Sequence, residues 1–125
     1  MQGYSKSRNV DGFLLLDKPY NISSNTALQK VKKIFNARKA GHAGSLDPIA
    51  TGMLLVCFGE ATKFVKYLIN LDKRYQVILK LGESTSTFDS EGELLKSSIV
   101  DCSYTKIIKV LKKFIGKTYQ IPPLY

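Results

Sequence analysis

The 125-residue chain contains one histidine, two cysteines and no tryptophan. His42 is the only imidazole, and Cys57 and Cys102 stand alone without a CxxC spacing. A metal site built from histidine and cysteine ligands therefore cannot be assembled from these residues, and we expect no metal. The isolated thiols also favour a reduced compartment over an oxidising one.

Long apolar runs are missing as well. The N-terminal residues MQGYSKSRN are polar and do not resemble the apolar core of a signal peptide. The longest uninterrupted apolar run is 53–58, whereas a membrane-spanning helix needs about 20 apolar residues. Together with the lone thiols, these features predict a cytoplasmic protein.

Acidic residues are few: 10 aspartates and glutamates stand against 19 lysines and arginines, which gives a formal charge of +9. Such an excess favours a polyanionic partner, and nucleic acid is the first to consider. A lysine-rich, solvated surface explains the same composition, so charge alone leaves both interpretations open. The length and the 44% apolar content predict a single domain with one core.

Apolar periodicity predicts the first elements. Residues 12–16, GFLLL, are typical of a buried strand that ends before Pro19. A helix is expected from Ser24 behind a Ser-Ser-Asn cap signal, with one apolar stripe: Ala27, Leu28, Val31, Ile34 and Phe35. A second helix follows the run MLLVCF, with its own stripe: Ala61, Phe64, Val65, Leu68 and Ile69.

Further along, the period changes. Residues 75–81 alternate as a strand does, and 83–93 carry turn-forming residues and four carboxylates, which predicts a surface loop. A third helix is expected over 104–115 with Gly116 as its stop. The final residues, including IPPLY, favour the start of another strand.

The stretch GHAGSLDPIATG, residues 41–52, fits neither a strand nor a helix period. Pro48 pushes Asp47 towards extended geometry and suits the first position of a helix, so Asp47 is expected at a helix N-terminus that stabilises its anion. A plain helix cap is the competing interpretation. Gly41 and Gly44 permit positive φ and close approach of a ligand. No Ser-His-Asp arrangement, phosphate loop or carboxylate pair accompanies Asp47, so an enzyme would have to use one carboxylate.

The segments GFLLLDKP, SSN, KAGHAGSLDPIATGMLLVCFGEATKF, DKRYQVILKLG and QIPPLY resemble, in order and spacing, the bacterial tRNA pseudouridine(55) synthases of the TruB type. The resemblance covers nearly the whole chain except the first ten residues and roughly 90–105. It implies an α+β catalytic-domain fold with a mixed, mainly antiparallel sheet and flanking helices. It also implies isomerisation of uridine 55 in the tRNA T-loop, with no cofactor or metal. The expected partner is the T-stem-loop of tRNA, and the expected state is a monomer.

The same resemblance assigns roles to residues. Asp47 matches the catalytic aspartate, and Tyr75 matches the tyrosine that stacks on the displaced base. Without the resemblance, the strand pattern favours a core tyrosine on the face of Val77 and Leu79. His42 matches a histidine that touches the T-loop, against a plain loop histidine as the alternative. The remaining RNA-binding candidates are Lys18, Pro19, Gly41, Gly44, Lys63 and Arg74, and for lysines a solvated side chain is the competing interpretation.

The sequence departs from the family pattern at Asn21, where glycine is usual, and at Ala43, where threonine is usual. The family also continues past PPLY with further strands, one bearing an arginine that partners the aspartate, and with an RNA-binding module. We therefore expect a flexible N-terminus over 1–10 and the N-terminal portion of a catalytic domain over 11–125. An inactive fragment that retains RNA binding is the alternative function, and a basic ribosome-associated protein is a third that leaves the Asp-Pro loop unexplained.

Overall fold

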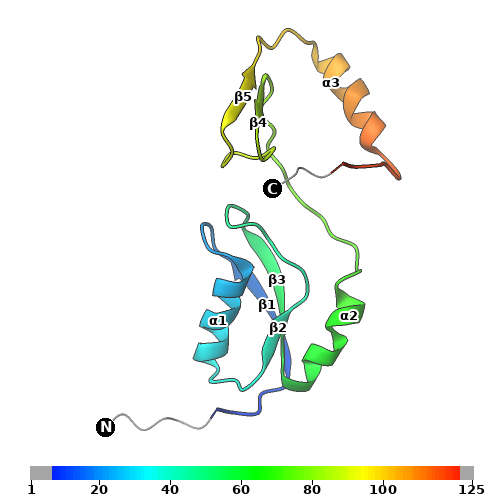
Figure 1. Ribbon diagram of the computed structural model, residues 1–125. Helices are drawn as coiled ribbons and strands as arrows, with labels where there is room; N and C mark the ends of the chain where they lie inside the picture. The colour runs from blue at the N-terminus through cyan, green and yellow to red at the C-terminus, as the bar shows by residue number, and fades with distance from the viewer. Residues whose placement is uncertain (1–6, 122–125) are drawn as a thin grey trace. The chain divides into compact units, whose positions relative to one another are not determined.

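The computed structural model describes residues 7–121, which divide into two compact units between Arg74 and Tyr75 (Figure 1). We call residues 7–74 the N-terminal unit and residues 75–121 the C-terminal unit. The length of the chain predicts one core for the whole domain, but every buried residue within 7–121 lies in the N-terminal unit. The α+β class is confirmed, since the elements are short antiparallel sheets with helices.

The N-terminal unit is built on a three-stranded antiparallel sheet in the order β1-β3-β2. The strands are β1 Gly12–Lys18, β2 Ala40–His42 and β3 Gly52–Phe58. Lys18 pairs with Gly52, and His42 pairs with Val56. The end of β1 and the connection from β2 to β3 therefore meet at one end of the sheet, and that connection contains Asp47.

Helix α1, Ser24–Ile34, covers one face of this sheet. The Ser23 side chain caps it by accepting a hydrogen bond from the Thr26 backbone N–H at 3.1 Å, as the Ser-Ser-Asn signal predicts. The core forms where its apolar stripe meets β3: Ala27, Leu28 and Val31 pack with Leu54, Val56 and Phe58. Ile34 is exposed instead, because the chain turns at Asn36, φ +50°, and Ala37 takes the buried position.

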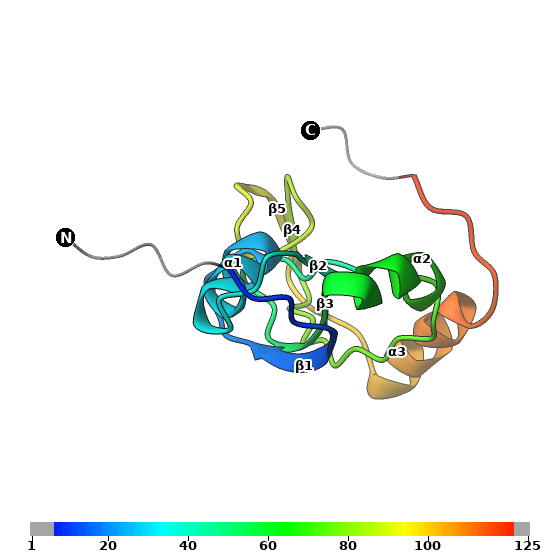
Figure 2. The ribbon, with the colours of Figure 1, turned by 90° about the horizontal axis from the view of Figure 1, so that it is seen from below.

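The opposite face carries a 3-10 helix, η1 Gly59–Phe64, continued by one turn of α-helix, α2 Val65–Leu68. Helices α1 and α2 lie on opposite sides of the strands in Figure 1 and also in Figure 2, which shows the molecule turned by 90°. The rings of Phe13 and Phe64 meet edge to face at 6.3 Å. This cover is thin: Phe13 and Leu15 remain more than half exposed, so the expectation of a buried strand holds only for one face of β1.

Part of the N-terminal segment is anchored. Arg8 donates its backbone N–H to the Asn36 carbonyl at 2.7 Å, and its carbonyl accepts from Arg38 N–H at 3.0 Å. Arg8 thus forms an isolated parallel bridge with Ala37, while the flexible terminus expected over 1–10 stays a prediction. Residues 1–6 of that expected segment lie outside the described residues.

The C-terminal unit contains a hairpin, β4 Glu83–Thr85 with β5 Leu94–Ser97, and a helix, α3 Tyr104–Leu111, followed by η2 Lys112–Phe114. The third predicted helix is confirmed: Ser103 caps it, and Gly116 follows it with φ +92°. The loop expected over 83–93 is corrected in part, because its first three residues form β4 and pair with β5, while Asp89 organises the turn between them. There Asp89 accepts from Thr87 Oγ1 and from the Glu91 N–H, and these bonds hold its pKa below the usual range.

Two predicted strands are not formed. Residues 75–81 have strand-like alternation but no strand assignment, because a strand needs a hydrogen-bonded neighbour and no ladder along this segment forms within the described residues. The strand expected after Gly116 is absent over 117–121, and its last four residues, 122–125, lie outside the described part of the chain.

Candidate functional site

Asp47 lies at an exposed position in the loop 43–51, which we call the Asp47 loop. The backbone N–H of Ala50 donates to the Asp47 carbonyl at 3.0 Å, so Pro48 and Ile49 form the centre of a single β-turn. The helix expected at Pro48 is wrong, because only four residues separate Asp47 from the start of β3 at Gly52. Asp47 therefore gains no helix dipole, and its carboxylate makes no hydrogen bond or ion pair within residues 7–121.

The side chain of Lys18 supports this turn through a hydrogen bond to Pro48. Its side chain is fully buried, and Nζ donates to the carbonyls of Ile22 at 2.7 Å, Pro19 at 3.1 Å and Pro48 at 3.2 Å. All three ammonium protons thus have backbone acceptors, which lets a charge be buried without a carboxylate partner. Lys18 therefore holds the loop through these three hydrogen bonds, and the RNA contact expected of it stays a prediction.

The same carbonyl of Pro48 has a second donor. The backbone N–H of Asn21 reaches it at 2.8 Å, with Asn21 at φ +62°. Asparagine tolerates this left-handed conformation better than most residues, as expected where the family pattern has glycine. The segment 18–22 and the residue after Asp47 are therefore joined by two hydrogen bonds.

Ser24 fixes the residue before Asp47. Its hydroxyl donates to the Leu46 carbonyl at 3.0 Å and accepts from the Leu46 N–H at 2.8 Å, and the side chain is buried. Sequence reasoning treated Ser24 only as part of a cap signal; its pairing with Leu46 was missed. With Leu46 and Pro48 both hydrogen-bonded, the backbone on either side of Asp47 is held while its side chain faces solvent. Such preorganisation is what a catalytic side chain requires.

His42 stands at the entrance to the loop. Its Nδ1 lies 2.6 Å from the Gly44 carbonyl, and because a carbonyl only accepts, Nδ1 carries the proton. In the neutral tautomer that this bond favours, Nε2 of the half-buried ring is an acceptor. Gly44 has φ +94°, and a Cβ there would lie 3.8 Å from Lys73 Cε, which places a cationic side chain that sequence reasoning missed beside the loop. The positive φ that glycine was expected to permit is therefore adopted at Gly44.

The other candidates are distributed more widely. Pro19 is exposed next to Lys18, and Gly41 is half-buried in β2. Lys63 lies on η1, exposed and ion-paired with Glu60, whose hydrogen bond and charge raise the pKa of Lys63. Arg74 is exposed at the end of the N-terminal unit. Tyr75 begins the C-terminal unit and is 63% exposed, so the alternative of a core tyrosine is wrong for this structure.

No group of three His, Cys, Asp or Glu side chains in 7–121 is arranged to hold a metal ion. Within the same residues, no helix combines the length and apolarity needed to cross a bilayer.

The chain is similar to known proteins over most of its length. Residues 32–125 match the family described as TruB family pseudouridylate synthase (N terminal domain). The tRNA pseudouridine synthase B of Blochmanniella floridana is 56% identical over 118 residues, covering 94% of this chain and 46% of the relative. That of Photorhabdus laumondii is 54% identical over 125 residues, covering all of this chain and 40% of the relative. The chain therefore spans less than half the length of these relatives.

Solved structures agree. A Cbf5-Nop10-Gar1 complex contains a chain that matches 90% of this one with a TM-score of 0.63 and 32% identity, covering 29% of that chain. An H/ACA RNP bound to a substrate RNA containing 2'-deoxyuridine matches 90% of this chain with a TM-score of 0.62 and 30% identity, covering 30% of its counterpart. The resemblance read from the Asp-Pro loop is thus confirmed over most of the sequence and of the fold: the chain belongs to the TruB family of pseudouridylate synthases.

Proposed function

We propose that this chain takes part in the isomerisation of uridine to pseudouridine in tRNA, at position 55 of the T-loop. The observation that carries the proposal is the Asp47 loop: an exposed carboxylate whose two backbone neighbours are held by buried side chains. The names of its relatives, tRNA pseudouridine synthase B, support the substrate class.

Asp47 is the proposed catalytic residue. In the reaction the bond from ribose C1′ to uracil N1 breaks, the base turns and a bond from C1′ to C5 forms. The proton of C5 is released to solvent and N1 takes up a proton, so that the product is an isomer of the substrate. An ionised carboxylate serves either as nucleophile at C1′ or at the uracil ring, or assists glycosidic cleavage, and none of these roles requires a partner base. The exposed position of Asp47 suits a base that has been turned out of its stack.

The neighbouring residues have proposed roles towards RNA. His42 Nε2 is available to accept a hydrogen bond, for example from a ribose 2′-OH. Gly44 keeps the loop free of side-chain bulk, Gly41 does the same in the preceding strand β2, and Pro19 borders the loop. Lys63 and Arg74 are proposed phosphate contacts, although Lys63 must share its ammonium with Glu60. Tyr75 is proposed to stack on the displaced base, since its ring is exposed.

The test transplants this chain into a full-length relative. The 125 matched residues of the Photorhabdus laumondii enzyme are replaced by this chain, and tritium release is measured from a tRNA transcript labelled at uracil C5. The chimera is expected to release tritium from a wild-type transcript labelled at all its uracils, and to release none above background from the same labelled transcript when uridine 55 is replaced by cytidine.

The relative with its own N-terminal residues is the control for the assay. A chimera that folds, as judged by its thermal melt, and binds tRNA but releases no tritium would contradict the proposal. Release that persists from a transcript labelled everywhere except position 55 would contradict the assignment of the site.

A further inference from the structure

A pocket lies at the end of the N-terminal sheet opposite the Asp47 loop. It has a volume of about 380 Å³ and is lined by, among others, Arg8, Asp11, Arg38, Lys39, Gly59 and Glu60. The sheet register places it, since Gly12 and Ala40 both pair with Phe58, at the far end of β3 from Gly52. None of its three cationic residues belongs to the proposed site, so their function is open.

The backbone holds the three cationic residues around this pocket. Arg8 and Arg38 are linked by the N–H of Arg38 and the carbonyl of Arg8 at 3.0 Å, and the Lys39 carbonyl accepts from Gly59 N–H at 2.9 Å. The chain segments that carry Arg8, Arg38 and Lys39 are thereby fixed to one another independently of what their side chains do. A convergent set of cations on a hydrogen-bonded frame is a more defined feature than a row of lysines on a helix surface.

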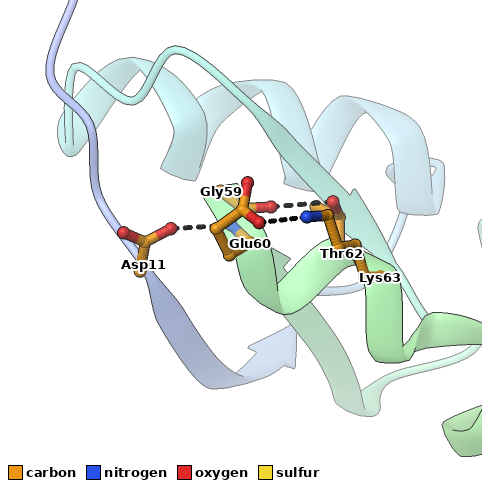
Figure 3. A network of polar contacts seen from close by, with 5 residues as sticks. All are labelled: Asp11, Gly59, Glu60, Thr62 and Lys63. Atoms are coloured by element: carbon orange, nitrogen blue, oxygen red, sulfur yellow. Dashed lines mark hydrogen bonds and ion pairs between the residues drawn. The ribbon is translucent and has the colours of Figure 1, made fainter.

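The carboxylates of the pocket already have partners (Figure 3). Asp11 accepts the backbone N–H of Glu60 at 2.6 Å, where it caps the start of η1, and Glu60 is ion-paired with Lys63. In contrast, no ion pair within residues 7–121 involves Arg8, Arg38 or Lys39. Of the two carboxylates only Asp11 has no cationic partner, so the three cationic residues outnumber it and the lining keeps a net positive charge.

Guanidinium groups present several N–H donors in a planar fork that matches the oxygens of a phosphate. We propose that Arg8, Arg38 and Lys39 bind a phosphate group of the RNA backbone, at a second contact remote from the Asp47 loop. The seven residues of β1 separate the two places by roughly 20 Å along the sheet, at about 3.3 Å per residue. The inference rests on RNA as substrate class, and adds to it a contact several nucleotides away from the reacting one.

The experiment measures the affinity of the full chain for an unmodified tRNA transcript over a series of salt concentrations. The variant Arg8→Gln/Arg38→Gln removes two pocket charges, and Lys96→Gln/Lys109→Gln removes two exposed charges from the C-terminal unit as the matched control. Each lost phosphate contact lowers the slope of log K against log salt by about 0.9 for duplex nucleic acid. We expect the pocket variant to lose a slope of 1 to 2 and roughly tenfold affinity at low salt, and the control to lose less than half as much.

Folding is monitored by thermal melts, and it should be preserved because the frame uses backbone groups of Arg8 and Arg38 rather than their side chains. The variant Arg8→Lys/Arg38→Lys should recover most of the slope, since it keeps both charges. Equal slopes for the pocket and control variants would overturn the proposal. A second result would also overturn it: inorganic phosphate binds the wild type but not the pocket variant, while both proteins show the same slope of log K against log salt for tRNA. The pocket would then bind free phosphate and not RNA. Loss of activity in the tRNA assay does not bear on this result, since binding alone is measured.

Discussion

The two units differ in what they bury. In the N-terminal unit, α1 and β3 enclose a core, and even Lys18 and Ser24 are buried with all their polar groups bonded. In the C-terminal unit no described residue is buried, and Ile99 is 96% exposed. An apolar groove of about 560 Å³ remains open there between residues 79–82, 99–102 and α3. Local elements thus form in both units, but only one of them excludes water.

The comparison separates two requirements for a stable helix: local sequence signals and a surface to pack against. Helix α3 has a serine cap, an apolar stripe and a glycine stop, as α1 has its own cap and stripe, so sequence signals of similar quality exist in both units. What α3 lacks is a facing surface like that which β3 offers to α1. Most helical stability in proteins comes from tertiary packing rather than from local propensity. The Asp47 loop is attached to the unit that has this packing.

The largest expected effect is in amide hydrogen exchange. Amides of β1 and β3 require opening of the core, whereas those of the β4–β5 hairpin require only local opening, since an isolated two-stranded hairpin is marginal in water. With a global stability of about 5 kcal/mol, exchange in the hairpin should be faster by on the order of a thousandfold. Exchange followed by mass spectrometry measures this, and equal protection in both units would contradict the comparison.

A pair of alanine substitutions tests the same contrast through stability. Leu54→Ala removes a side chain that is 2% exposed and should lower the free energy of unfolding by about 2–5 kcal/mol. Ile99→Ala removes one that is 96% exposed and should change it by less than about 0.5 kcal/mol. Urea unfolding monitored by circular dichroism gives both values. A large loss for Ile99→Ala would indicate that the groove is packed in solution.

The reactivity of the two thiols also tests the difference in burial between the units, with a smaller expected effect. Cys57 is buried in β3, and burial raises the pKa of its thiol, so less thiolate is present at a given pH; Cys102 is exposed. Iodoacetamide reacts with thiolate, so Cys102 should be alkylated at least about tenfold faster than Cys57 at pH 8. Peptide mapping after timed quenching distinguishes the two sites. In denaturant the rates should converge, and similar rates under native conditions would contradict the burial of β3.

Much of the N-terminal unit could be predicted from the sequence because its signals are local. The cap at Ser23, the stripe Ala27-Leu28-Val31 and the apolar run of β3 each require only neighbouring residues. What could not be predicted depends on contacts distant in sequence. The three-residue strand β2 is defined only by its pairing with β3, and residues 75–81 alternate correctly but lack a ladder partner in the described chain.

The site shows the same division. The motif predicts Asp47 and His42 as candidates, since Asp-Pro and the glycines are visible in one short stretch. The motif could not show that the Ser24 hydroxyl is hydrogen-bonded to Leu46, 22 residues away in the sequence. Nor could it show that the buried Lys18 donates to the carbonyl of Pro48, 30 residues away. It also misled about the helix after Pro48, because local geometry permits one while the distance to β3 leaves room only for a turn.

The central claim is that a folded N-terminal unit presents Asp47 as the reacting carboxylate, and Asp47→Asn in the chimera tests it most directly. Asparagine keeps the shape and removes the charge, and the Asp47 carboxylate has no partner within residues 7–121 whose loss would destabilise the fold. Asp17→Asn, at an exposed position of β1, is the matched control. The account predicts that tritium release from uracil C5 falls to background for Asp47→Asn and is unchanged for Asp17→Asn, with melting temperatures and tRNA affinities equal to wild type. Turnover by the Asp47→Asn chimera near the wild-type rate would contradict it.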